Sequence, residues 1–240
     1  MSKRDPGPFL RDEFIPDKRI ERFALELLSA TGLLPNEPKP VAVDKICDHK
    51  WGVPEDYEKL DADVMGYSAF TYKGFAGIVI NSELENDRSV TGVRRLRSTI
   101  AHEIGHAILH ERLFIEKLIF DHNQKLLFGE IERTAPIPTA IVCRNNDIFG
   151  RSGKIKWWEV QANKFMASLL IPKPLFLQIV ESPLADYDPE NATPPERVKN
   201  YYGSIETVMA KFNVSREMSS IAVDNYLAKG RPKVTWEALL

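Results

Sequence analysis

The chain has 240 residues, of which 43% are apolar and 28% are charged, and its 32 basic residues nearly balance 34 acidic ones. This composition indicates a globular protein of one or two domains and excludes disordered and collagen-like chains. The formal net charge of −2 argues against a surface that is built as a whole to bind nucleic acid or an anionic membrane.

The N-terminal region is predicted to be an extended arm that leads into a helix. Residues 1–17 contain three prolines and lack the apolar segment of a signal peptide. From Asp17 onward, apolar residues recur at helical spacing until Gly32, which is expected to end the helix. Two distant cysteines, Cys47 and Cys143, and the lack of an apolar run of about 18 residues favour a reduced, cytoplasmic protein that does not enter a membrane.

A short helix and a β-hairpin are predicted next, followed by a longer helix. Residues 41–51 can form the short helix, and the segments GYSAFTY and FAGIVIN have the composition of two strands joined by a tight turn. Residues 82–90 are polar and are predicted to be a loop. A helix is then expected from Thr91 to about Leu113.

The second half of the chain is predicted to be mainly helical. The stretch 114–156 holds two strand-like pieces, KLLFGE and TAIVCR. A helix with the sequence WWEVQANKFMASLL begins near Lys156 and is expected to stop before Pro172. The proline-rich, acidic segment 182–196 is predicted to be a linker, and two helices over about 196–212 and 215–228 follow it.

The segment TIAHEIGHAILH carries the strongest chemical signal in the sequence. It contains His-Glu-x-x-His, and His102 and His106 lie one helical turn, about 6 Å, apart on one helix face. Two imidazoles in this arrangement can bind one zinc ion, and Glu103 can accept a proton from water that the metal activates. Because the helix is otherwise mostly apolar, a metal ion is the simplest partner for its buried histidines.

A catalytic zinc site needs a third protein ligand, and Glu159 is the best candidate. Asn163 follows it by one helical turn and can accept a hydrogen bond from the free N–H of a ligating histidine. The alternative interpretation of Glu159 is a solvated acid on an amphipathic helix. The rival third ligands are His122, Glu111, Glu116 and Glu130.

His110 continues the four-residue spacing, but helix geometry argues against it as a ligand. It lies about 12 Å along the axis from His102 on an uninterrupted helix. The sequence also lacks the glycine that lets the chain turn back in the metzincin pattern. We therefore expect His110 to be a hydrogen-bonded residue near the helix end, with a supporting or substrate-side role as the lesser option.

Two motifs of the chain resemble the ImmA/IrrE family of metallopeptidases. The string RLRSTIAHEIGHAILH is similar to the family core R-x-R-F-T-[IL]-A-H-E-[LI]-G-H, and WWEVQANKFMASLLIP is similar to E-x-x-A-N-x-F-A-x-x-L-L-x-P. The segments PVAVDKI, GIVIN and FNVSREM also fit, so that the resemblance covers roughly residues 40–225. Ser98 and Met166 depart from the pattern, and the stretch between the two motifs is longer than expected for the family.

The resemblance implies an α+β fold of the minimal zincin-like type, with helices around a small β-sheet. Three parts are expected: an arm and helix over 1–38, a zincin-like metallopeptidase domain over 39–181, and a linker with C-terminal helices over 182–240. The implied activity is that of a zinc-dependent endopeptidase, which is associated in this family with mobile elements and stress responses. The implied zinc ligands are His102, His106 and Glu159, and the implied catalytic base is Glu103.

The resemblance also implies a protein partner, a helix-turn-helix repressor of the XRE type whose cleavage releases transcription. The alternative is a non-enzymatic module that sequesters a repressor or toxin, but binding alone does not need the base Glu103. Direct DNA binding through the last two helices is disfavoured by the near-neutral charge. The sequence leaves open which residue stabilises the oxyanion; the candidates are Tyr67, Arg97, His110, Tyr201 and Tyr202.

Overall fold

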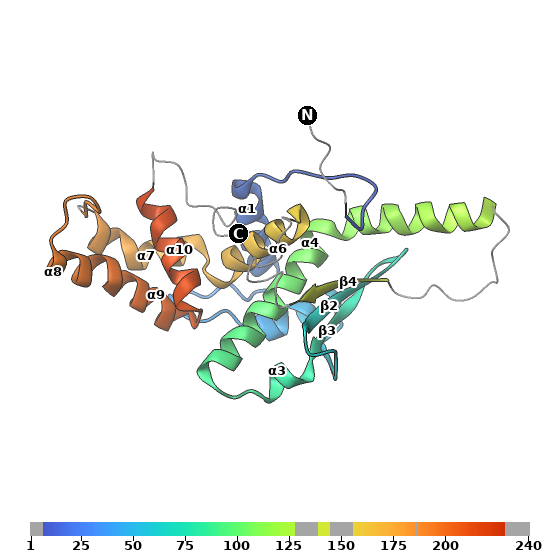
Figure 1. Ribbon diagram of the computed structural model, residues 1–240, viewed down its shortest axis with the longest axis horizontal. Helices are drawn as coiled ribbons and strands as arrows, with labels where there is room; N and C mark the ends of the chain where they lie inside the picture. Colours follow the sequence, from blue (N-terminus) through green and yellow to red (C-terminus); the bar gives the residue numbers. More distant parts are fainter. Residues whose placement is uncertain (1–6, 128–138, 145–155, 186, 229–240) are drawn as a thin grey trace.

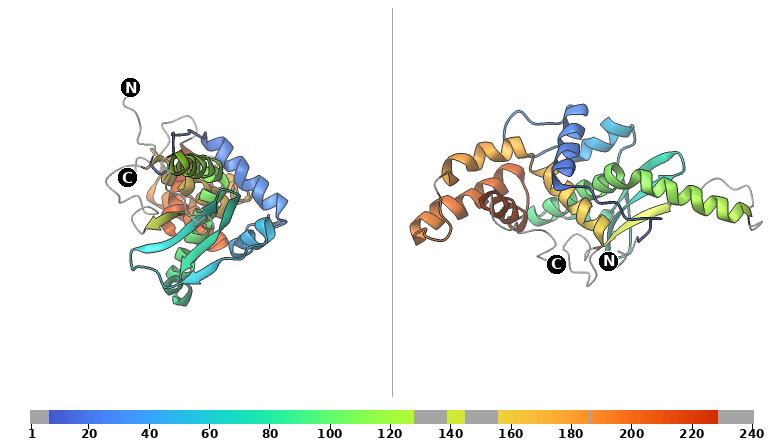
Figure 2. Two further views of the ribbon diagram at one scale, coloured as in Figure 1. Left: turned by 90° about the vertical axis from the view of Figure 1, so that its right-hand side faces the viewer. Right: turned by 90° about the horizontal axis from the view of Figure 1, so that it is seen from above.

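A computed structural model describes residues 7–127, 139–144, 156–185 and 187–228 of the chain. In these residues a four-stranded sheet lies against one side of a long central helix, and further helices cover its other side (Figure 1). The expected α+β class, with helices around a small sheet, is therefore confirmed. Seen from above, the C-terminal helices form one end of the molecule and the far half of the central helix forms the other (Figure 2).

The N-terminal region agrees with the prediction. Residues 7–16 contain no helix or strand, and α1 (Asp17–Ala30) begins directly after Pro16 and ends before Gly32. The predicted short helix over 41–51 is also present, in two pieces, a 3₁₀ turn η1 (Val43–Lys45) and α2 (Ile46–Trp51).

The sheet contains the predicted hairpin and two further strands. Its strands are β1 (Asp56–Glu58), β2 (Val64–Thr71), β3 (Gly74–Asn81) and β4 (Thr139–Arg144), in the spatial order β1-β3-β2-β4. β1 runs parallel to β3, whereas β2 is antiparallel to both of its neighbours. The strand predicted for TAIVCR is thus confirmed as β4. The short polar strand β1 was not predicted, because its sequence lacks an apolar alternation.

The central helix α4 (Val90–Leu127) is longer than predicted. The sequence indicated an end near Leu113, but the next 14 residues contain neither proline nor glycine, and two i,i+4 ion pairs support the helix. These pairs join Arg112 to Glu116 at 2.9 Å and Lys117 to Asp121 at 2.5 Å. The strand-like interpretation of KLLFGE is wrong for residues 125–127, which are helical, and its remainder lies outside the described residues.

The predicted loop over 82–90 contains a short helix that the sequence analysis missed. α3 (Ser82–Asn86) begins after Asn81, whose side chain accepts a hydrogen bond from the backbone N–H of Glu83 at 3.1 Å. Asparagine is a strong helix N-cap, so that one residue turns a polar segment into a helical turn.

α6 (Trp157–Leu170) forms as predicted and stops before Pro172. The next helix, α7 (Lys173–Leu184), begins at once, with Pro174 in its first turn. Proline is tolerated there because the first N–H groups of a helix have no internal acceptor. The predicted linker over 182–196 is therefore correct only in part, since its first three residues belong to α7 and its last three residues, 194–196, are also helical.

The predicted C-terminal helices are confirmed with small changes at their ends. The first consists of α8 (Pro194–Glu196), a six-residue π-helical segment η2 (Arg197–Tyr202) and α9 (Gly203–Phe212). The second is α10 (Arg216–Leu227), which is capped by Ser215, as its sequence indicated, through a 3.1 Å bond from the N–H of Met218.

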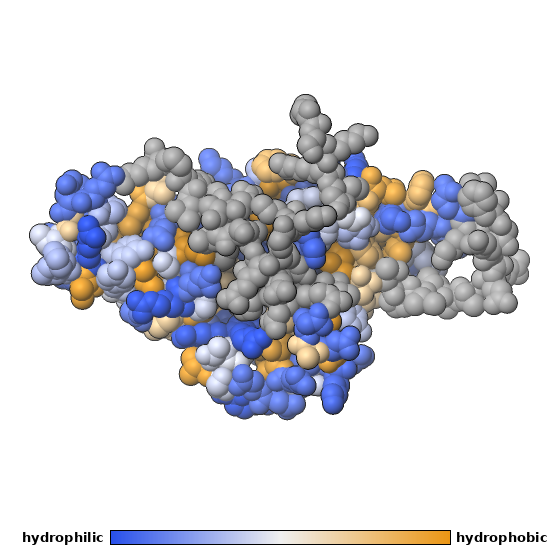
Figure 3. Space-filling view, in the orientation of Figure 1, coloured by the Kyte–Doolittle hydropathy of each residue, from blue (hydrophilic) through white to orange (hydrophobic). Residues whose placement is uncertain are grey.

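Buried apolar side chains form two clusters. The larger one joins α1, α2, the sheet, α4, α6, α7, α9 and α10. The smaller one, called the arm cluster below, consists of Phe9, Phe70, Leu113, Phe114, Ile141 and Trp158. Apolar residues also reach the surface where α4 extends beyond the body of the molecule (Figure 3), and Ile119 and Phe120 are 46% exposed there.

Within the described residues, no single helix is both long and apolar enough to cross a membrane. Only α6 and α7 taken together, with a 70° bend between them, meet that criterion of length and composition.

Candidate metal centre

The candidate site lies where α4 and α6 cross at close range. A Cβ atom on Gly105 of α4 would lie 3.1 Å from the carbonyl oxygen of Ala162 and 3.3 Å from the ring of Phe165. A larger residue at this position would require α6 to shift by a few tenths of an ångström. The close crossing brings the polar face of α4 against the N-terminal half of α6, which carries Glu159 and Asn163.

Three ligand atoms meet at this crossing. His102 Nε2 lies 3.0 Å from both Glu159 Oε2 and His106 Nε2, and His106 Nε2 lies 3.4 Å from Glu159 Oε2. Tetrahedral zinc ligands at their usual distances are about 3.4 Å apart from one another. The two histidines are fully buried and Glu159 is 5% exposed. The three side chains can therefore hold a metal ion.

Asn163 fixes the orientation of His102. Its Oδ1 atom lies 3.0 Å from His102 Nδ1 and accepts a hydrogen bond from that nitrogen. With the proton of the neutral ring on Nδ1, the lone pair of Nε2 faces Glu159 and His106. The structure thus brings Asn163 to the position that the sequence analysis expected for it.

His106 is oriented by a second chain of hydrogen bonds that runs through His110. Gln161 donates from Nε2 to the backbone carbonyl of Glu13 at 2.7 Å, so that its Oε1 atom accepts from His110 Nε2 at 3.0 Å. Burial, with a contribution from His106, lowers the pKa of His110 to about 3, and its ring is neutral. His110 Nδ1 therefore accepts from His106 Nδ1 at 3.0 Å, and the lone pair of His106 Nε2 is free.

When both imidazoles are neutral, these two chains of hydrogen bonds leave no proton among the three central atoms. A proton on one Nε2 atom would satisfy one of the three close contacts, whereas a cation between the atoms satisfies all of them. Although burial alone would raise the pKa of Glu159, the neighbouring His106 and His102 hold it well below its usual range, so that Glu159 is a carboxylate. Two imidazoles and one carboxylate are a donor set that fits a metal ion.

Glu103 lies beside this group and is fully buried. Its Oε2 atom accepts a 2.5 Å hydrogen bond from the hydroxyl of Ser68 on β2, and its Oε1 atom has no hydrogen-bond partner among the described residues. Burial raises the pKa of Glu103, against the charges of His106 and His102 and the hydrogen bond from Ser68. Ser68 thus fixes one carboxylate oxygen of Glu103, and the other oxygen is free to accept a proton.

The rival ligands lie elsewhere in the described structure. Glu111 accepts a hydrogen bond from the backbone N–H of Phe75, and Glu116 pairs with Arg112. His122 is exposed on the far half of α4. The remaining rival, Glu130, lies outside the described residues.

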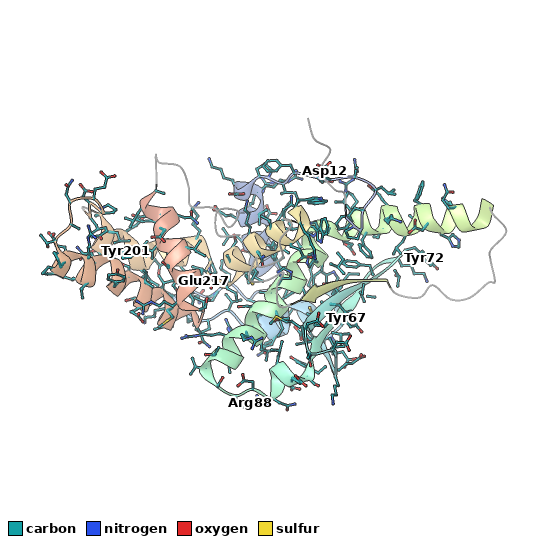
Figure 4. All side chains as sticks on the ribbon, viewed as in Figure 1. Asp12, Tyr67, Tyr72, Arg88, Tyr201 and Glu217 are labelled. Atoms are coloured by element: carbon teal, nitrogen blue, oxygen red, sulfur yellow. The ribbon has the colours of Figure 1, made fainter. Side chains whose placement is uncertain are left out.

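Among the oxyanion candidates, His110 contacts the ligand His106, whereas Arg97 donates to the backbone carbonyl of Val41 at 2.9 Å. Tyr67 lies on the face of β2 opposite to Ser68, because side chains alternate along a strand (Figure 4). Tyr201 donates to Asp224 among the C-terminal helices, and Tyr202 is 45% exposed. His110 is engaged on both ring nitrogens.

Sequence reasoning missed Ser68, Gln161 and the carbonyl of Glu13. A serine in a strand or a backbone carbonyl in an arm gives no signal in a sequence. Gln161 did offer a signal, since it is a polar residue in a helix that is mostly apolar in sequence. It is 6% exposed in the structure.

A scan against models of protein families finds no match, and a search of curated proteins finds no significantly similar sequence. The function is therefore argued from the geometry of the site and from the motifs that form it.

Proposed function

We propose that this protein is a zinc-dependent endopeptidase. The observation that carries the proposal is the meeting of His102 Nε2, His106 Nε2 and Glu159 Oε2 within 3.4 Å of one another. Two histidines and one glutamate are a ligand set of catalytic zinc, which keeps a fourth position open for water or substrate. The free oxygen of Glu103 beside these ligands supplies the base that peptide hydrolysis needs.

Zinc bound at this site would polarise the peptide carbonyl and acidify a water molecule. Glu103 would remove the proton from the attacking water through Oε1 while Ser68 holds Oε2. The same carboxyl group would then deliver the proton to the amide nitrogen as the C–N bond breaks. The buried position of Glu103 suits both steps, since its carboxyl group can hold the proton between them.

The proposed substrate is a helix-turn-helix repressor of the XRE type, and its cleavage would change gene expression in the cytoplasm. This part of the proposal rests on the resemblance to ImmA/IrrE metallopeptidases. The motif residues that carry this resemblance also build the site. Gly105 permits the crossing of α4 and α6, and Asn163 orients His102.

The first prediction concerns the metal. Purified wild-type protein reconstituted with zinc is expected to hold one ion per chain by elemental analysis, and His102→Ala is expected to hold none, because two remaining ligands bind zinc too weakly. His122→Ala is the matched control, since His122 is exposed on the same helix and should keep the full zinc content. Wild-type protein without zinc after reconstitution would contradict the proposal.

The second prediction concerns the base. Glu103→Gln is expected to retain zinc and to lower the rate of cleavage by about 10²–10⁴-fold, because glutamine cannot accept the proton. The measurement is cleavage of a helix-turn-helix protein encoded beside this one, followed by gel electrophoresis. A partner that stays bound and intact with zinc-loaded wild-type protein would favour a sequestering module over a peptidase.

A further inference from the structure

The metal group is closed off from solvent in this structure. His102, Glu103 and His106 are 0% exposed, and Glu159 is 5% exposed. A peptide bond must come within reach of Glu103 to be hydrolysed. Some part of the chain must therefore move before a substrate can enter.

The strand β4 lies next to the residue that holds Glu103. It pairs antiparallel with β2, and its Ile141 is the register partner of Ser68, whose hydroxyl contacts Glu103. Adjacent strands are about 4.8 Å apart. β4 is also the outermost strand on this side of the sheet, so no other described strand would have to move with it.

The side chain of Ile141 is buried in the arm cluster, which also contains Trp158 beside the ligand Glu159. Register partners project from the same face of a sheet, so Ile141 points to the α4 side, as Ser68 does. Ile141 is 4% exposed and belongs to the arm cluster, together with Phe70 of β2, Phe114 of α4 and Trp158 of α6. Trp158 directly precedes the ligand Glu159.

β4 thus connects the strand that holds the base with the start of α6, because Ile141 shares the arm cluster with Trp158. Figure 1 shows β4 beside β2, on the side toward the crossing of α4 with α6. A peptide that reaches Glu103 from this edge of the sheet would need the space that β4 fills. An extended peptide also binds best by adding a strand to a sheet edge, where pockets for alternate side chains provide selectivity.

We propose that β4 pairs with the edge of β2 to which an extended substrate would otherwise bind. When β4 leaves, β2 presents its free main-chain groups and the pocket of Ile141 to an extended substrate segment with an aliphatic side chain. Substrate and β4 compete for the same edge of β2, and the metal group stays closed off from solvent until β4 is displaced. This inference rests on the proposed peptidase function and specifies the substrate segment and the closed state of the site.

The principal test measures peptide binding to the full-length, zinc-loaded chain. The probe is a fluorescein-labelled peptide with the sequence of residues 137–146, with serine in place of cysteine, and binding is followed by fluorescence anisotropy. Wild-type protein is expected to bind it weakly, because its own β4 is present at a high effective concentration. Ile141→Asp is expected to bind it at least tenfold more tightly, because a charge in the apolar pocket drives β4 out.

Matched controls separate this effect from general loosening of the fold. Ile119→Asp makes the same change at a 46% exposed position on α4 and should bind the probe as weakly as wild type. A probe with aspartate in place of its central isoleucine should bind none of the chains. Circular dichroism verifies the fold of each variant, and Ile141→Ala, a milder change, should give a smaller gain in affinity.

A reversible lock tests the same proposal from the opposite direction. Ala69 and Ala140 are register partners on β2 and β4, and antiparallel partners have Cα distances of about 4.5–5.5 Å, which suit a disulfide. The double variant Ala69→Cys, Ala140→Cys is made in a chain with Cys143→Ser. Its oxidised form should bind no probe and cleave no partner, and a reductant should restore both to the level of the Cys143→Ser chain.

The outcomes distinguish this proposal from the proposed function. If the folded Ile141→Asp chain binds the probe no more tightly than Ile119→Asp, the proposal about β4 is wrong. Equal cleavage by the oxidised and reduced lock overturns it as well, while leaving the peptidase function intact. Zinc content and the loss of cleavage in Glu103→Gln test the function by themselves, and probe binding requires neither result.

Discussion

At the scale of single residues, the site is organised by where each proton sits. Asn163 draws the proton of His102 to Nδ1, and Gln161, acting through His110, does the same for His106. Each amide is therefore necessary for a lone pair that faces the metal position. An isolated pair of histidines on a helix would exchange tautomers freely, so the hydrogen-bonded neighbours are what turn the pair into a ligand set.

A half-buried carboxyl outside the site, Glu55, gives a prediction about stability and pH. Burial raises the pKa of Glu55 to about 7, from an ordinary value of 4.5, and the charges of Asp44 and Asp48 act in the same direction. Between these two pH values the folded chain holds a proton that the unfolded chain has lost. The free energy of unfolding therefore decreases as pH rises through this window.

The third prediction follows from this decrease in the free energy of unfolding with rising pH. In Glu55→Gln the titrating group is absent, so the decrease in melting temperature from pH 5 to pH 8 should be smaller than in wild type. Thermal denaturation followed by circular dichroism at both pH values measures the difference. Glu58→Gln, an exposed position on β1, is the control and should keep the wild-type decrease. An unchanged pH dependence in Glu55→Gln would contradict the assignment.

At the scale of elements, the crossing of α4 and α6 positions the third ligand. Glu159 reaches the two histidines only because the helices approach closely at Gly105, where Ala162 and Phe165 of α6 pack against α4. A helix pair at a wider separation would bury the same apolar faces but would leave the carboxylate out of reach. The small residue at the crossing thus sets the geometry of the metal site.

The fourth prediction tests this crossing. Gly105→Ala is expected to lower the free energy of unfolding by about 1–3 kcal/mol, as overpacking does, and to weaken zinc binding because α6 is pushed away. Gly203→Ala is the matched control, since its new methyl group would meet nothing closer than 3.6 Å and alanine favours a helix. Urea denaturation and zinc titration measure both effects. Equal stability of the two variants would show that the crossing tolerates the methyl group.

At the scale of the whole molecule, the N-terminal arm meets α4 and α6 beside the site. The N-terminal arm places Phe9 against His110, Phe114, Trp157 and Trp158, with ring centroids 5.4–6.0 Å apart. The same arm supplies the Glu13 carbonyl that orients Gln161. The N-terminal arm therefore helps to fix the tautomer of His106, which lies about 90 residues further along the sequence.

The fifth prediction concerns this arm. Phe9→Ala is expected to lower the free energy of unfolding by about 3–5 kcal/mol or to detach the arm locally. In either case the network that orients His106 is weakened, and zinc affinity should fall by about 10–100-fold. Phe14→Ala, a change in the same arm at a residue that is 72% exposed, should leave both unchanged. Competition with a chromophoric chelator measures the affinity, and equal values for the two variants would contradict the role of the arm.

Much of the fold could be predicted because its signals are local. Helical spacing predicted α1, α6 and α10, and short apolar runs predicted β2, β3 and β4. The end of α4 was predicted too early, because the sequence gives no stop there and ion pairs on the helix surface carry it onward. The short helix α3 was missed because it depends on one capping side chain.

The sequence by itself determined the candidate ligands. His102 and His106 share one face through helical periodicity, and Glu159 and Asn163 share one face in the same way, so their relations lie within single helices. Whether the two faces meet was decided only by tertiary packing at Gly105. The same holds for Ser68 on Glu103, for the arm on Gln161, and for β4 across the site. These contacts join segments 35 or more residues apart, and no local periodicity encodes them.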